Sequence, residues 1–534
     1  MALLRARAVA RWQTLRPRTR HWLINIAIGI AIVTLLNWVG HGLRLPIVVN
    51  AQNGAFDRMI RATAVVAPEG HEGLPAPPKL VLIDIDDQTW RDARWGGGEP
   101  ARAPRELLAS LIEGAFQRGA SQVVLDIAVE GSTGREHDLL ENRHFAARLD
   151  TMLTAAWFGA DRQLVLVRTL RQPLPVRARM LAGAPMDALP FAEGYFDEFR
   201  ESPAIDAVVA RSKGRIVLAA PFFSISPDRV LRDWQLLQVV CERNSGERQG
   251  TVRIVPSVQV AVAARHFGLP AGAEPWQLAA PAARCAPFPA EAGQLELTPH
   301  DATLTPALQA QADALVASSW RATQSAFAKF GVGMSAQVPR VDDLGNRVVF
   351  RWASAPSVVP AIEMVFGQVL HDLKGRVVLI GETFPETVDH HFTPLGDMPG
   401  AVVLLNAIDS MTRHRIVATP SSWITVPLAL TMIIVVGYAF ARWSSLLGTI
   451  VATCAILAVL PWISFSLFKQ GVWLDFALPL FGIQVHKLIT SLEESLAKRQ
   501  REAIAARRLD TPPVEGLAGV QHSENIAPKR GDSP

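Results

Sequence analysis

The chain has 534 residues, of which 49% are hydrophobic and 19% charged, and its mean hydropathy is +0.19. This composition favours one large domain with membrane helices over two or three soluble domains. The net charge of +4 does not indicate nucleic acid as a partner, and three cysteines exclude both a disulfide-dense scaffold and a zinc site with four thiolate ligands.

The first apolar run, residues 22–40, follows a strongly basic segment, residues 1–21. A cleaved signal peptide has the same order of segments and is the alternative interpretation. A retained transmembrane helix is favoured because the run is about 18 residues long and no small-residue cleavage site follows it. We therefore expect a first membrane span here.

Three further apolar runs follow a long middle segment, residues 41–420, that has no run long enough to span a bilayer. They cover residues 422–441, 445–468 and 472–490. Because basic segments stay in the cytoplasm, the basic N-terminus places the middle segment in the periplasm. The basic start of residues 491–534 is then cytoplasmic too, in a short and partly disordered tail. This topology is that of a multi-pass protein of the bacterial inner membrane.

The middle segment has the pattern of an α/β domain with a largely parallel central sheet. KLVLIDIDDQTW, which starts at Lys79, and SQVVLDIAVEG are apolar runs of strand length, and the segment from Arg105 to Gly119 between them has apolar residues at helical spacing. The strand-like LKGRVVLIGETF and the helix-length MPGAVVLLNAIDSMTRH repeat this signature at the far end. The sheet is therefore expected to take strands from both ends of the domain.

FDRMIRAT, VLIDIDDQTW, PRELLASLIEGAFQRGASQVVLDIAVE and GRVVLIGETFPETVDHHFTPLGDMPGAVVLLNAID occur in this order. These blocks resemble the CHASE type 2 family, the extracellular sensory domains of bacterial cyclases and histidine kinases. The resemblance implies an α/β sensory domain with one span before it and three after it. The chain departs from the usual pattern of this family in two ways. Only about 45 residues follow Ile489, too few for an output domain. The last helix reads LLNA, with Asn406 but without the histidine that often precedes an Ala-Asn pair there in similar sequences.

Carboxylates follow the predicted strands, at the edge where open α/β sheets bind ligands. They could bind a cation or a cationic ligand, or cap nearby helices. The candidate ligand residues are Asp84, Asp86, Asp87, Asp126, Asp389 and Asn406.

Other motifs are weak. His390 and His391 are adjacent, so in a strand they would point to opposite faces, and no metal site is expected. No nucleophile, P-loop or zincin motif occurs, so neither an enzymatic activity nor a cofactor is expected. The glycines at 96–98 are interpreted as a flexible connection rather than a phosphate loop. Cys241 and Cys285 are a possible disulfide or two unpaired thiols.

These features predict a sensor subunit that detects a periplasmic ligand or protein and relays the signal to a separate cytoplasmic signalling protein. A membrane scaffold that assembles an envelope complex is the alternative, and a periplasmic enzyme using the carboxylates is a third hypothesis. After the last span, Val485, Leu488, Leu492 and Leu496 form an apolar stripe. This stripe is compatible with a homodimer contact or with a helix on the lipid surface.

Overall fold

The computed structural model consists of two compact units. Its described residues are 16–38, 46–64, 76–98, 103–127, 129, 136–168, 195–197, 203–226, 228–242, 251–272, 276, 306–328, 347–367, 372–385, 389–413, 417, 422–443, 445–469, 471–474, 488, 491–492, 495–496, 498–500 and 502–503. The first unit comprises Met1–Leu43, Ala429–Ile456 and Leu478–Pro534, and the second comprises Arg44–Leu428 and Leu457–Ala477.

A six-stranded sheet forms the centre of the second unit, and each of its strands pairs in parallel with its neighbours. The strand order is β10 (Val358–Pro360), β1 (Leu80–Ile85), β11 (Val377–Glu382), β2 (Gln122–Leu125), β3 (Gln163–Val167) and β5 (Ile216–Ala219). Strand β11 belongs to the C-terminal part of the domain's sequence, and it lies between β1 and β2 in the sheet. The predicted α/β class and the largely parallel sheet are confirmed.

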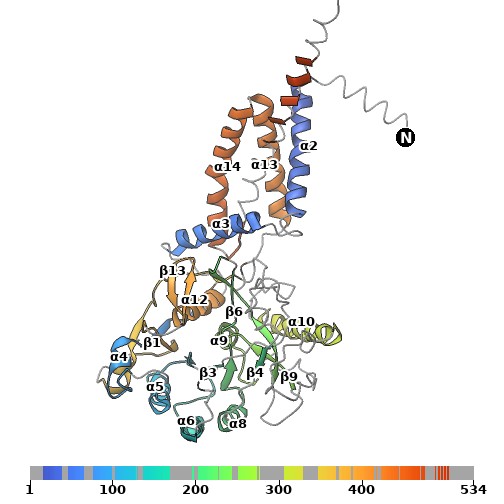
Figure 1. The fold of residues 1–534 in the computed structure, drawn as a ribbon. Helices are drawn as coiled ribbons and strands as arrows, with labels where there is room; N and C mark the ends of the chain where they lie inside the picture. The colour runs from blue at the N-terminus through green and yellow to red at the C-terminus, as the bar shows by residue number, and fades with distance from the viewer. Residues whose placement is uncertain are drawn as a thin grey trace, which may run out of the picture. The chain divides into compact units, whose positions relative to one another are not determined.

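Both faces of this sheet are buried, because successive apolar side chains point to opposite sides. Leu82 and Leu379 lie in one hydrophobic core, and Ile83 and Ile380 lie in another. The first core is closed by α9 (Val258–His266) and α12 (Gly400–Arg413), and the second by α5 (Arg105–Gln117), α6 (Glu136–Thr154), α8 (Pro203–Arg211) and α11 (Ala361–Phe366). Helices α5, α6 and α8 of the second face follow one another in Figure 1.

Three smaller sheets complete the strands of the described residues. One contains β4 (Tyr195–Asp197), β8 (Leu237–Glu242) and β9 (Thr251–Pro256); the hairpins β6 (Phe223–Ile225) with β7 (Leu231–Trp234) and β12 (His390–Thr393) with β13 (Gly396–Pro399) are the others. The short helix α4 (Asp87–Arg91) follows β1, and α10 (Pro306–Ala328) contacts β8.

Helices occupy three of the four segments in which membrane spans were expected: α2 (Pro17–Trp38), α13 (Ser422–Arg442) and α14 (Ser445–Phe468). Within the described residues, only Ile450–Phe468 of α14 is both long and apolar enough to cross a membrane. Trp22–Ala31 and Pro427–Ala439 are shorter apolar stretches. Residues 472–490 lie mostly outside the described part of the chain. Of the four expected spans, the one at α14 is therefore supported.

Helix α3 (Pro46–Ala64) was not expected from the sequence. One side of it packs into the first hydrophobic core through Phe56, Met59 and Ile60. The rings of Phe468 and Trp473, at and just after the end of α14, contact Phe56 edge-on at 5.7 and 5.3 Å between centroids. Helix α3 therefore joins the α/β domain to the end of α14.

Candidate functional site

The carboxyl edge of the sheet gathers acidic residues around β11. Asp84 of β1 lies beside Gly381 of β11. On the other side, the backbone N–H of Asp126 donates to Ile380 O at 2.8 Å, which places Asp126 next to Gly381 as well. Two of the predicted ligand residues thus flank a position that has no side chain.

Asp84 is a nearly buried carboxylate with a single side-chain donor among the described residues. The hydroxyl of Thr383 donates to both of its oxygens, at 2.7 and 2.8 Å. Burial raises the pKa of Asp84 to about 6, against the lowering effect of the Thr383 hydrogen bond and with a further increase from the charge of Asp86. Asp84 is consequently able to gain or lose a proton near neutral pH.

Asp126, Glu382 and Asp389, here called the carboxylate cluster, repel one another. Burial raises the pKa of Asp126 to about 7, helped by the charges of Asp389 and Glu382 and opposed by His391. Burial, with a contribution from Asp389, also raises the pKa of Glu382. Asp389 is exposed and lies 2.8 Å from Nε2 of His391. The cluster therefore favours protons or positively charged groups from the solvent.

Two glycines make the space in which the cluster lies. A Cβ on Gly381 would be 2.7 Å from Cβ of Ala401, so α12 can approach the sheet only over a glycine. A Cβ on Gly400 would be 1.7 Å from Oδ2 of Asp389, so this carboxylate occupies the place beside the first residue of α12. The N–H of Gly400 donates to the carbonyl of Asp389 at 2.8 Å. The positive end of the α12 dipole thus faces an acidic residue.

Two other predicted ligand residues, Asp86 and Asp87, interact with groups of the short helix α4. Asp86 is its N-cap and accepts a hydrogen bond from the N–H of Thr89 at 2.8 Å, which confirms the capping interpretation for this residue. Asp87 forms an exposed ion pair with Arg91 at 2.8 Å.

Asn406 lies elsewhere, fully buried in α12. Its Oδ1 accepts from the N–H groups of Arg351 and Trp352, and its Nδ2 donates to the carbonyls of Trp352 and Val402. The amide thus holds the 351–352 backbone against α12. This arrangement supports a structural role for Asn406, apart from the carboxylates at the edge of the sheet.

Sequence reasoning missed several residues of this edge. Glu382 and Thr383 follow β11 directly, and the same end-of-strand rule that selected Asp126 could have identified them. Trp90 and Phe384 stack at 4.4 Å between centroids, with an interplanar angle of 8°. Phe384 directly follows Thr383, but nothing in the sequence indicates that its ring stacks on the ring of Trp90.

The adjacent histidines and the glycines at 96–98 make contacts within the domain. His390 and His391 have different partners, Asp397 and Asp389, and no group of three potential metal ligands occurs in the described part of the chain. The N–H groups of the glycines at 96–98 donate to carbonyls of Trp90 and Asp92, so the turn does not present them to a phosphate. Cys285 lies outside the described residues, and its bond to Cys241 stays a prediction.

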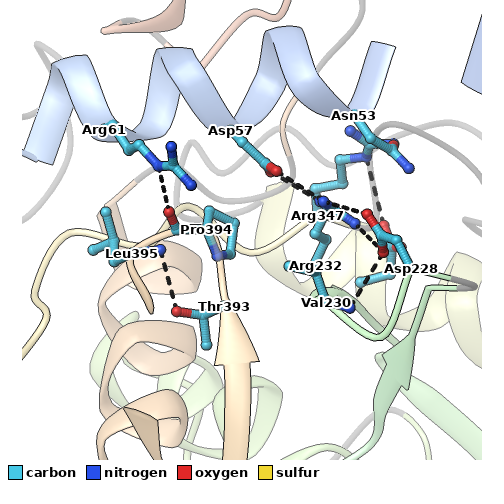
Figure 2. Close-up of polar contacts among 11 residues, drawn as sticks. Asn53, Asp57, Arg61, Asp228, Val230, Arg232, Arg347, Thr393, Pro394 and Leu395 are labelled. Carbon is cyan, nitrogen blue, oxygen red and sulfur yellow. Dashed lines mark hydrogen bonds and ion pairs between the residues drawn. The ribbon is translucent and has the colours of Figure 1, made fainter. Parts of the chain in front are cut away.

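A second site, also missed, joins α3 to the β6–β7 hairpin and is here called the α3 junction. It consists of Asn53, Phe56, Asp57, Asp228, Arg232 and Arg347. Arg232 of β7 forms two hydrogen bonds with Asp57 of α3, at 2.8 and 2.7 Å, and another with Asp228 at 2.8 Å (Figure 2). Burial lowers the pKa of Arg232, but the bonds and charges of these two carboxylates raise it well above its ordinary value. Arg232 is therefore a fixed buried cation that holds α3 on the domain.

Arg347 extends the α3 junction to the aromatic end of α14. It donates to Asn53 and lies 4.8 Å from the ring centroid of Phe56. Asn53, Phe56 and Asp57 occupy one helical turn, so their side chains share one face of α3. The same turn contacts the β6–β7 hairpin through its polar atoms and Phe468 through its ring.

Replacing Asp126 with Asn should change how the stability of the protein depends on pH. Because the folded-state pKa is raised, the folded chain binds more protons than the unfolded chain, and stability falls as pH rises from about 4 to about 7. The Asn variant should gain on the wild type by on the order of 2 kcal/mol between about pH 5 and pH 8. Chemical unfolding of the purified full-length protein measures this difference. The exposed Asp150→Asn is the control, and equal slopes for all three proteins would contradict the electrostatics described.

Replacing Arg232 with Met should destabilise the second unit by about 3–5 kcal/mol, because Asp57 is left buried without its partner. Arg211→Met is the matched control: Arg211 forms an exposed pair with Asp150 at 2.9 Å, and its loss should cost less than about 1 kcal/mol. Equal melting temperatures for the two variants would show that the α3 junction does not hold α3.

The edge of the sheet is thus an acidic, proton-accepting site on an α/β domain that is joined through α3 to an apolar helix. Comparison with protein families shows that residues 28–442 match the CHASE2 domain. Neither the search of curated proteins nor that of solved structures gave a match. The matched segment includes the whole central sheet, α3, and α13. The chain belongs to the CHASE2 family of extracellular sensory domains.

Proposed function

We propose that this chain is an inner-membrane sensor subunit that detects a periplasmic signal and relays it to a separate cytoplasmic protein. The observation that carries the proposal is the family match, which covers the α/β domain as a whole. The α3 junction supports it further, since it fastens the domain to the end of α14, the helix that is apolar and long enough to cross a membrane.

The proposed topology has four spans, at residues 22–40, 422–441, 445–468 and 472–490, with both termini in the cytoplasm. Helix α14 supports the third position, and the first two positions coincide with the helices α2 and α13, whose apolar stretches are shorter. Residues 41–420 then lie in the periplasm, which agrees with membership of a family of extracellular domains.

The signal-responsive site of the proposal is the carboxylate cluster together with Asp84. Raised pKa values at Asp84 and Asp126 favour a positively charged ligand, because a cation nearby relieves the repulsion between the carboxylates. Binding, rather than catalysis, is proposed here.

The relay to a partner is proposed to use the stripe of leucines after the last span. Leu488, Leu492 and Leu496 are all more than half exposed, at a spacing of four residues. At least two of them lie on helical backbone, since the residues around 492 and 496 are helical. Such a stripe is a helix face that can pack against another helix.

Replacing the three leucines with Ser should abolish the recovery of a cytoplasmic signalling protein. The experiment is an affinity pull-down of the full-length chain from detergent-solubilised native membranes, with the proteins identified by mass spectrometry. The control, Lys498→Ala, changes an exposed charge on the same segment and should have no effect.

Recovery of a cyclase, kinase or similar effector with the wild type and the control, but not with the triple variant, is the expected result. Equal recovery of envelope proteins with all three chains, and of no cytoplasmic effector, would contradict the relay and favour the membrane scaffold.

A further inference from the structure

Helix α3 has a second face that is largely exposed, here called the uncovered face, and Arg61 on it makes one hydrogen bond to the domain. Its exposed residues recur every three or four positions: Ile47, Asn50, Ala51, Arg58, Arg61 and Ala62. They lie opposite Phe56 and Ile60, which are fully buried in the domain. The uncovered face thus combines an apolar end with two arginines.

The contact between α3 and the end of α14 indicates what surrounds the uncovered face. The apolar part of α14, Ile450–Phe468, has 19 residues, which at about 1.5 Å per residue gives a length of roughly 29 Å, the thickness of the hydrocarbon core. Phe468 therefore lies at one boundary of that core. Because the Phe468 ring touches Phe56, α3 lies at the same level.

The arginines on the uncovered face can bind anions. Arg58 is exposed and forms no ion pair with any described residue. Arg61 uses only its Nε, which donates to the carbonyl of Pro394 at 2.8 Å (Figure 2), so its two terminal nitrogens are not needed for that bond. Guanidinium groups pair with phosphate through two parallel hydrogen bonds.

We propose that the uncovered face of α3 binds the headgroups of anionic phospholipids at the periplasmic surface of the membrane. The inference rests on the proposed membrane anchoring of α14. Ile47 enters the boundary region and the arginines hold the phosphates, as in other interfacial helices. The opposite face of the same helix holds the sensory domain, so the domain is oriented by the lipid surface as well as by the spans.

The test places a fluorescent non-natural amino acid at one of three positions in the full-length protein, in nanodiscs that contain brominated lipids as quenchers. Position 51 is on the uncovered face of α3, and position 457 replaces an exposed leucine of α14. Position 151 replaces an exposed threonine of α6, in the helix layer on the second face of the sheet. We expect strong quenching at 457, intermediate quenching at 51 and none at 151.

The charge requirement is tested by titrating brominated phosphatidylglycerol into phosphatidylcholine nanodiscs. Arg58→Gln should raise the fraction of phosphatidylglycerol that half-quenches position 51 about fivefold, the effect of one basic residue at an anionic surface. The exposed Arg143→Gln on α6 is the matched control and should change nothing.

Quenching at 457 but not at 51 would overturn the inference and leave the membrane anchoring intact, and it is also the result expected if a protein covers this face. No quenching at 457 would overturn the anchoring itself. Quenching at 51 that does not depend on Arg58 or on lipid charge would overturn the phosphate contact.

Discussion

A parallel sheet that is buried on both faces can place polar groups only at its ends. In this domain the alternation of side chains between two hydrophobic cores fills both faces, for example with Leu82 on one side and Ile83 on the other. The carboxyl edge is therefore the place where Asp84 and Asp126 can reach solvent or a ligand. Gly381 lies between them, and α12 closes over this glycine, which draws the cluster together at the helix N-terminus.

The contacts that join the domain to the end of α14 lie outside the central sheet. The α3 junction provides the attachment with a buried cation, Arg232, shared by Asp57 and Asp228. A buried ion pair adds little stability compared with apolar packing, but it is costly to break, so it specifies one arrangement of α3 on the β6–β7 hairpin. The ring of Phe56, on the same turn of α3, contacts the ring of Phe468 at the end of α14. A shift at the domain can reach α14 through one helical turn.

Much of the fold was predictable because apolar runs record burial directly. Strands β1, β2 and β11 and helix α5 were expected from such runs, and Asp84 and Asp126 followed from the rule for strand ends. The capping role of Asp86 was among the predicted alternatives, whereas the role of Asn406 was not predictable, since a clamp on the 351–352 backbone depends on local geometry. Helix α3 was missed because its turns mix polar and apolar residues. Asp57 and Asn53 acquire their roles only from Arg232 and Arg347, 175 and 294 residues away.

The membrane segments show a different limit. Hydropathy predicts that a run can span a bilayer, and α14 meets this expectation, but packing partners decide whether shorter runs such as Pro427–Ala439 do so too. The proposed spans, the carboxylate edge and the α3 junction would act together in signalling only if the domain responds to a ligand.

The most direct measurement is the melting temperature of the full-length protein in detergent with a panel of polyamines and basic amino acids. A cationic ligand at about a hundred times its Kd should add roughly 2.7 kcal/mol of stability, visible as a rise in Tm. The rise should disappear in Asp126→Asn and persist in Asp150→Asn. No shift with any cationic compound, or a shift that Asp126→Asn leaves unchanged, would contradict a cation-responsive sensor at this edge of the sheet.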